Sequence, residues 1–183
     1  HYGDDRLISI VPFGTNEEIH YFQTQDESAG EVIVMGATFD KVNRQYLDNF
    51  VIEGLPPVRY NHPYAQFLDL PDGSHLAFIN ASDTPELRIY KINPQARTAT
   101  LLQFHTLGNF IEGQIDAFKD PYDPGKIKYA FKNPSTINLC LWEYDSGTNT
   151  FNQLADNVKG APSVLSVDRY NQWLLIASEP NPD

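Results

Sequence analysis

The chain has 183 residues, of which 41% are hydrophobic and 13% aromatic, so it can build a packed core and is too apolar for a disordered chain. With 24 acidic and 13 basic side chains it carries a formal net charge of -11, which repels phosphate backbones and argues against nucleic acid as a partner. The single cysteine, Cys140, rules out an intramolecular disulfide, and no apolar run approaches the roughly 20 residues that cross a bilayer. We therefore expect one folded domain over residues 1–183, with no transmembrane segment.

Short segments rich in Val, Ile, Tyr and Phe, separated by Gly, Pro, Asn and Asp, predict β-strands along the whole chain. A strand, turn and strand unit recurs four times, over residues 8–22, 67–79, 115–131 and 164–176. The clearest copy has the turn Pro71-Asp72-Gly73 between two apolar strands, and we expect Asp72 and Gly73 to form a hairpin turn.

Two further strand candidates follow each of the first three hairpins, joined by polar turns at Asp40, Asn93 and Asp145, about 50 residues apart as in propeller blades. Four antiparallel strands per unit predict an all-β fold, a β-propeller-like array of four-stranded blades. The approximate units are 6–52, 64–104, 114–155 and 163–177, the last incomplete. A β-sandwich or a barrel is the alternative fold.

The stretch from Leu70 to Phe78, with Pro71-Asp72-Gly73 before an apolar strand, and the following stretch from Glu86 to Tyr90 resemble the repeat of TolB-type (WD40-like) β-propellers. The resemblance is clearest over residues 67–104. It implies a propeller blade and, by analogy with the family, a protein-interaction or solute-binding role. Because fold does not fix function, it assigns a role to no residue.

Catalytic chemistry has little support in the sequence. There is no Gly-x-Ser-x-Gly elbow, and Cys140 alternates with leucines inside a predicted strand, where a buried apolar role is expected. The five histidines lack the close spacing of a zinc site. Asp69, Asp116 and Asp168 precede comparable turns and leave a carboxylate-dependent hydrolase as an alternative.

Two groups of loop residues are candidates for binding. Asp116, Asp120 and Asp123 offer the oxygen ligands that calcium prefers, although solvated turn aspartates are expected in a chain this acidic. Aromatic side chains near loops offer flat faces for sugar rings, although propeller cores are also aromatic. These aromatic candidates are Tyr60, Tyr64, Tyr122, Tyr170 and Trp173.

The function that we expect from the sequence is a non-catalytic propeller-like module that binds a partner protein through its loops or one face of the ring. Carbohydrate binding is the first alternative. We expect no cofactor, with calcium as the one candidate. The incomplete fourth unit leaves room for closure by association, so a homo-oligomer is considered too. The compartment stays open, with an extracytoplasmic or secreted location slightly favoured.

Overall fold

The computed structural model describes most of the chain, and its strands fall into two compact units, His1–His105 and Thr106–Asp183. The described residues are 6–26, 31–58, 65–80, 84–107, 115–132, 139–158, 164–167 and 173–176. Among these, the side chains of the last two segments and of Asp26, Lys132, Asn157 and Val158 are not described. Every element is a β-strand, so the all-β expectation is confirmed. Among these residues, no helix is long and apolar enough to cross a membrane. The single-domain expectation stays a prediction.

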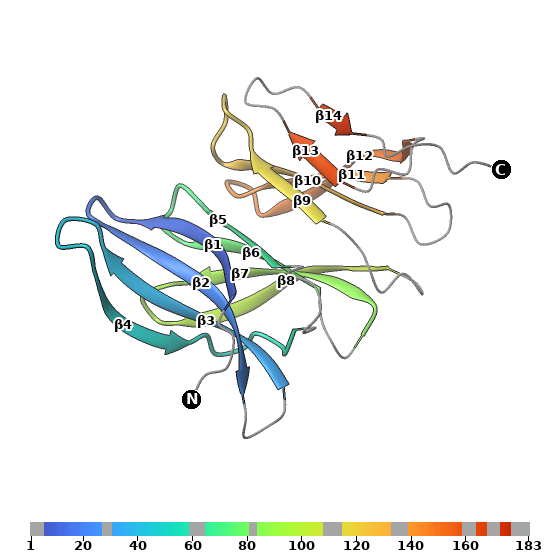
Figure 1. The fold of residues 1–183 in the computed structure, drawn as a ribbon. Coiled ribbons are helices and arrows are strands. Elements are labelled where there is room, and N and C mark those ends of the chain that lie inside the picture. Colours follow the sequence, from blue (N-terminus) through green and yellow to red (C-terminus); the bar gives the residue numbers. More distant parts are fainter. Residues whose placement is uncertain are drawn as a thin grey trace. The chain divides into compact units, whose positions relative to one another are not determined.

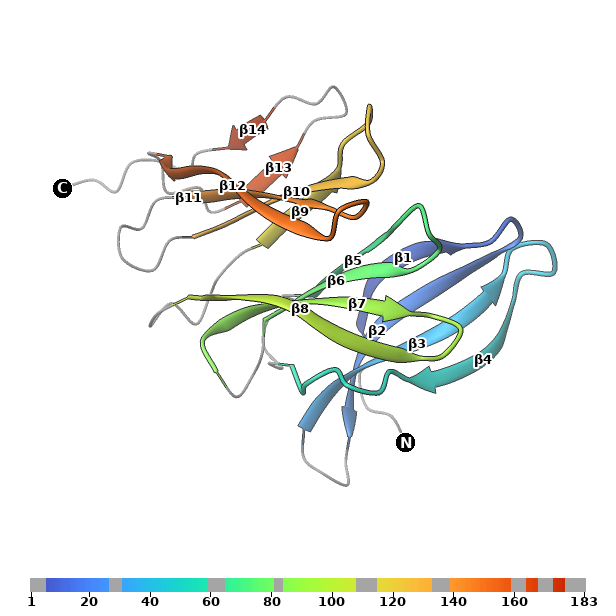
Figure 2. The ribbon, with the colours of Figure 1, turned by 180° about the vertical axis from the view of Figure 1, so that it is seen from behind.

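The first unit contains two four-stranded antiparallel sheets, each formed by strands in chain order (Figure 1). The first sheet comprises β1 (Arg6–Phe13), β2 (Glu17–Asp26), β3 (Glu31–Asp40) and β4 (Gln45–Val51). The second comprises β5 (Ala65–Asp69), β6 (His75–Asn80), β7 (Glu86–Asn93) and β8 (Thr98–Thr106). The edge strands are β1 and β4 in the first sheet and β5 and β8 in the second, as Figure 2 shows from behind. Each sheet corresponds to one unit of the sequence repeat.

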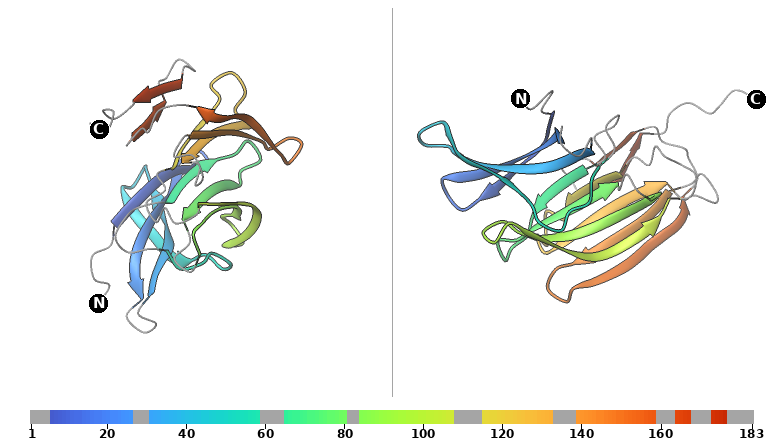
Figure 3. Two further views of the ribbon diagram at one scale, coloured as in Figure 1. Left: turned by 90° about the vertical axis from the view of Figure 1, so that its right-hand side faces the viewer. Right: turned by 90° about the horizontal axis from the view of Figure 1, so that it is seen from below.

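The second unit repeats the pattern with β9 (Ile115–Lys119), β10 (Lys126–Lys132), β11 (Leu139–Asp145) and β12 (Thr150–Val158). A separate hairpin pairs β13 (Val164–Val167) with β14 (Trp173–Ile176), and β13 contacts β9. Figure 3 shows the twist of each four-stranded sheet from two further directions. Three four-stranded antiparallel sheets and one further hairpin agree with the three and a half units that the repeat predicts.

The repeat extends to the hydrogen bonds of the turn between the third and fourth strands of each sheet. Oδ1 of Asp40 accepts hydrogen bonds from the backbone N–H groups two and three residues later, at 2.8 and 3.1 Å. Oδ1 of Asn93 does the same at 3.1 and 3.0 Å, and Oδ1 of Asp145 at 2.9 and 3.2 Å. Each turn then passes through a residue with positive φ, namely Arg44 (55°), Arg97 (61°) and Asn149 (55°). The three predicted turn residues are therefore equivalent in structure.

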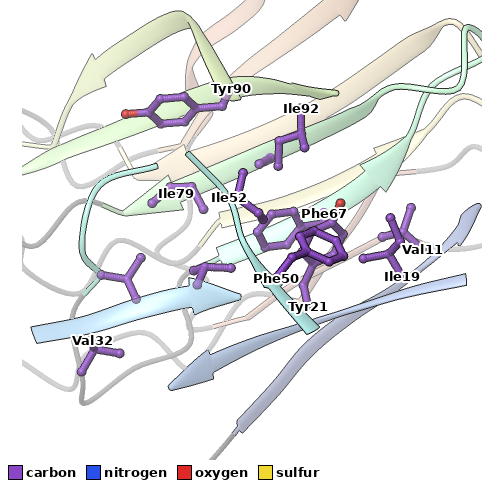
Figure 4. Close-up of a cluster of buried hydrophobic side chains, with 13 residues drawn as sticks. Val11, Ile19, Tyr21, Val32, Phe50, Ile52, Phe67, Ile79, Tyr90 and Ile92 are labelled. Atoms are coloured by element: carbon purple, nitrogen blue, oxygen red, sulfur yellow. The ribbon is translucent and has the colours of Figure 1, made fainter. Parts of the chain in front are cut away.

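The hydrophobic core of the first unit lies between its two sheets (Figure 4). Tyr21 on β2 stacks on Phe67 of β5, with ring centroids 3.9 Å apart and planes 9° apart. The hydroxyl of Tyr21 also shares a buried 2.6 Å hydrogen bond with Nδ1 of His75, so this polar group is satisfied inside the core. The buried members of the core are Val11, Ile19, Tyr21, Val32, Val34, Phe50, Ile52, Val58, Phe67, Ala77, Ile79, Tyr90 and Ile92.

A second connection joins the two sheets where the chain leaves β4. Glu53 forms a parallel bridge with Thr98 of β8, and the N–H of Glu53 donates to the carbonyl of Arg97 at 2.9 Å. Gly54 has a φ of +90°, and a Cβ at this position would lie 2.7 Å from the carbonyl oxygen of Ala99. Only glycine fits this close backbone approach. The guanidinium of Arg97 then reaches back to the ring of Phe50, 4.8 Å from its centroid.

Gly73 provides a direct test of the predicted hairpin turn. Its N–H donates to the carbonyl of Leu70 at 3.1 Å, its φ is +80°, and the space around it is open. Gly73→Val should lower the free energy of unfolding by about 1–2 kcal/mol, because a β-branched residue is strained at positive φ. Gly73→Asn is the matched control and should cost less, since asparagine tolerates this conformation. Equal melting temperatures for Gly73→Val and the parent would count against the turn.

Candidate functional site

The structure places only part of the predicted aromatic site. Tyr60, Tyr64 and Tyr170 lie outside the described residues, and for Trp173 only the backbone of β14 is described. Tyr122 lies in the turn between β9 and β10, with 82% of its side chain exposed. The sugar-stacking hypothesis for these five residues therefore stays a prediction.

The aspartates proposed for calcium make hydrogen bonds within the protein. Lys128 donates from Nζ to Oδ2 of Asp120 at 2.9 Å, and this contact lowers the pKa of the Asp120 carboxyl. Asp123 accepts a hydrogen bond from the N–H of Gly125 at 3.2 Å, so its carboxylate stabilises the turn. Asp116 lies four residues before Asp120 along an extended segment, about 13 Å away at the usual rise of a strand. Among the described residues, no group of three His, Cys, Asp or Glu side chains could hold a metal ion. Calcium binding stays a prediction.

The carboxylates considered for hydrolysis are not brought together by any described geometry. Asp168 lies outside the described residues, while Asp69 and Asp116 belong to different units. Asp116 nevertheless has an unusual environment on β9. Burial raises the pKa of its carboxyl to about 6, and a hydrogen bond from the backbone of Ala117 opposes this shift. For the hydrolase alternative, the structure therefore shows one carboxyl with a raised pKa, and it gives no distance from this carboxyl to a second candidate carboxyl.

A mainly apolar sheet surface lies on the first sheet, on the face opposite the core, which we call the outer face. The strand register places three rows of side chains on this face. The rows are Leu7, Phe22, Met35 and Val51; Ile10, His20, Ala37 and Asn49; and Pro12, Glu18, Phe39 and Tyr46. All except Glu18, His20 and Asn49 are apolar or aromatic. Four large members are about half exposed: Leu7 (51%), Ile10 (51%), Tyr46 (54%) and Val51 (57%).

The polar groups in the middle of the outer face are hydrogen-bonded to one another. Nε2 of His20 lies 2.7 Å from Oε1 of Glu18, and its Nδ1 lies 2.9 Å from the hydroxyl of Tyr46. The imidazole ring also stacks on Phe39, with centroids 5.0 Å apart. Both ring nitrogens of His20 therefore have hydrogen-bond partners within the protein. The arrangement fixes the side chains and keeps the face mainly apolar.

A second candidate is a pocket of about 430 Å³ on the second sheet, beside the hairpin turn at Gly73. Lys91 donates from Nζ to Oδ2 of Asp72 at 2.7 Å, and the Ser74 hydroxyl donates to Oδ1 of the same carboxylate. The hydrogen bond from Lys91 is the main reason why the pKa of Asp72 is lowered to about 2. Gln95, Thr98 and Thr100 add an amide and two hydroxyls to the lining, while Ile92, Pro94 and Leu102 supply apolar surface.

Comparisons with known proteins support the fold. No family model and no curated protein matches the chain, so the TolB likeness stays a resemblance. The β-propeller domain of the Trilobed protease from Pyrococcus furiosus, described as having an open velcro topology, is similar over 84% of this chain and 44% of its own, at 9% identity and a TM-score of 0.52. An exo-β-1,3-galactanase from Phanerochaete chrysosporium is similar over 75% and 32%, at 12% identity and a TM-score of 0.47. The chain spans less than half the length of either protein. The fold is propeller-like, and likeness at this identity shows nothing beyond the fold.

Sequence reasoning did not identify the outer face, although a signal was present. Residues 7–11 read Leu-Ile-Ser-Ile-Val. This segment lacks the alternation of apolar and polar residues that is expected for a strand with one solvent-exposed face. The bulge between Leu7 and Ser9 then shifts the register, so that Leu7 joins Phe22 on the outer face and Ser9 opposes Tyr21. The bulge cannot be read from the sequence pattern alone.

The raised pKa of Asp116 predicts a measurable pH dependence of stability. The folded protein keeps the proton up to about pH 6, whereas an unfolded aspartate loses it near pH 4, so stability should fall as the pH rises between these values. Asp116→Asn removes this titration and should raise the free energy of unfolding at pH 7 by about 1 kcal/mol, after discounting for partial exposure. Urea unfolding of both proteins from pH 4 to 7 measures it. An identical pH profile for the variant would contradict the assignment.

Proposed function

We propose that this chain is a propeller-type interaction module that acts by binding another protein, not by catalysis, and that the outer face of the first sheet is its binding surface. The observation that carries the proposal is the exposure of Leu7, Ile10, Tyr46 and Val51 on one mainly apolar sheet face. Leu7 and Ile10 lie on β1, and Tyr46 and Val51 lie on β4; the partly exposed Phe22 and Met35 connect Leu7 with Val51 across the sheet. Exposed apolar side chains gathered on one face are typical of protein interaction sites, whereas scattered apolar residues are ordinary.

The chemistry of the outer face favours a protein over a small polar ligand. The outer face is one side of a twisted sheet. A partner that covers its half-exposed side chains would gain about 25 cal/mol of binding free energy for each Å² of apolar surface removed from water. Its Glu18, His20 and Tyr46 already form hydrogen bonds to one another, so contact with an apolar partner leaves fewer of their polar atoms without a partner. Tyr46 adds an aromatic side chain of a type enriched in interfaces.

Position-specific photocrosslinking tests this proposal in the cells that produce the protein. A p-benzoylphenylalanine residue replacing Tyr46 should give protein adducts upon irradiation, and Leu7→Lys in the same chain should reduce them at least tenfold. The same photoreactive residue replacing Tyr122, which is exposed in the other unit, is the matched control. Equal adduct yields at the two positions, or no effect of Leu7→Lys, would overturn the proposal.

The pocket beside Gly73 favours a second function, the binding of a neutral polyhydroxylated ligand such as a sugar. An Asp72 carboxylate held anionic beside Lys91 can accept hydrogen bonds from ligand hydroxyls, while the ammonium donates to others. A hollow of about 430 Å³ falls within the size range of small-molecule sites.

A glycan array followed by calorimetry tests the second function. Lys91→Met keeps the length of the side chain but removes the donor, and it should weaken any captured glycan at least tenfold. Lys41→Met, at an exposed lysine in the turn after β3, should leave binding unchanged. The second function fails if the array captures no glycan or if both variants bind as the parent does.

A further inference from the structure

The last strand of the second sheet, β8, has an unprotected edge (Figure 2). An edge strand offers unpaired backbone N–H and C=O groups, and proteins usually protect such an edge with charged residues, proline or short length. β8 is nine residues long and contains no Asp, Glu, Lys, Arg or Pro. The other edge strands of the three four-stranded sheets each contain at least one of these residues, namely Arg6 and Pro12 in β1, Asp48 in β4, Asp69 in β5, Asp116 and Lys119 in β9, and Asp156 in β12.

The protein itself already pairs an extended segment with this edge at one position. Glu53 forms a parallel bridge with Thr98, in which the N–H of Ala99 donates to the carbonyl of Glu53 at 2.8 Å. The chain then turns at Gly54, whose φ is +90°, and its next bridge is to β3. In the described part of the chain, no further strand lies along the β8 edge beyond Ala99. The parallel pairing therefore begins at this edge and is not continued.

Two large apolar side chains follow the point where this pairing stops. Leu101 and Phe104 are 48% and 52% exposed, respectively. Neighbouring strands lie about 4.8 Å apart, so a strand placed beside β8 would bring its own side chains against these two. Backbone hydrogen bonds and apolar burial would then stabilise the same contact.

We propose that the β8 edge from Leu101 to Thr106 binds an extended segment of another protein, which joins the second sheet as a fifth strand parallel to β8. The direction continues that of Glu53. Strand addition of this kind obtains its affinity from main-chain hydrogen bonds. The edge is separate from the outer face of the first sheet, so the proposal goes beyond the function proposed above.

Charge indicates the chemistry of the bound segment. β8 has no charged side chain that would attract an acidic partner, and the formal net charge of -11 repels one. A second copy of this chain is disfavoured for the same reason. The exposed Glu53 lies at the start of the edge, where the N-terminal end of a parallel segment would lie. We therefore expect a segment with apolar residues and a basic residue at its N-terminal end.

A phage-displayed library of random dodecapeptides, selected on the full chain, provides the probe. Binding of the selected peptides is then measured by fluorescence anisotropy. Leu101→Lys should weaken it at least tenfold, because a charge on the edge opposes strand pairing. Leu154→Lys is the matched control and should leave binding unchanged, since Leu154 is 46% exposed on the edge strand β12 of another sheet.

Peptide variants test the backbone pairing and its direction. Alternate residues of a strand direct their N–H groups to the same neighbour, so N-methylation should weaken binding only at every second peptide residue. A lysine at the N-terminal end of the peptide should give about twofold tighter binding than one at the C-terminal end, as expected for an exposed ion pair. Glu53→Gln should remove this difference.

Three results would overturn the proposal. They are a library that yields no peptide weakened by Leu101→Lys, equal weakening by Leu154→Lys, and an N-methylation profile without a period of two. If Leu7→Lys weakens binding and Leu101→Lys does not, the peptide occupies the outer face and the edge is not the site. A preference for lysine at the C-terminal end would overturn the parallel direction.

Discussion

A four-stranded antiparallel sheet has two faces and cannot bury either by itself, and this constraint governs the first unit. The inner face of the first sheet is covered because Tyr21 stacks on Phe67 of the second sheet, with the aliphatic side chains of both sheets packed around the pair. Loss of that contact would expose two apolar sheets at once. Stability of each blade therefore depends on its neighbour, as expected for repeat architectures.

Polar contacts between the two sheets restrict the way in which they stack. The Tyr21 hydroxyl would be costly to bury without a partner, and His75 of the second sheet provides one. At the edge, Arg97 in the turn between β7 and β8 lies over Phe50 and pairs with Asp48, so one side chain of the second sheet's turn contacts two residues of β4. These polar contacts form only when the two sheets stack in one position, whereas apolar burial alone would allow one sheet to slide over the other.

The same constraint explains why the outer face of the first sheet is the best candidate for function. Its apolar side chains resemble those of a blade interface, yet Leu7 and Val51 remain about half exposed. Within it, the hydrogen bonds of His20 to Glu18 and Tyr46 keep the polar atoms satisfied without water. The pocket beside Asp72 differs in chemistry, since it is lined by charged, amide and hydroxyl groups, and it suits a small polar ligand better than a protein surface.

The sequence alone determined the class of fold. Strand composition, the spacing of Asp40, Asn93 and Asp145, and the turn at Gly73 are local signals, because each depends on a few neighbouring residues. Only the tertiary structure decided which faces are buried and which stay exposed. Tyr21 and Tyr46 look alike in sequence, but one is fully buried and the other half exposed, since burial depends on strand register and on the sheet that packs opposite.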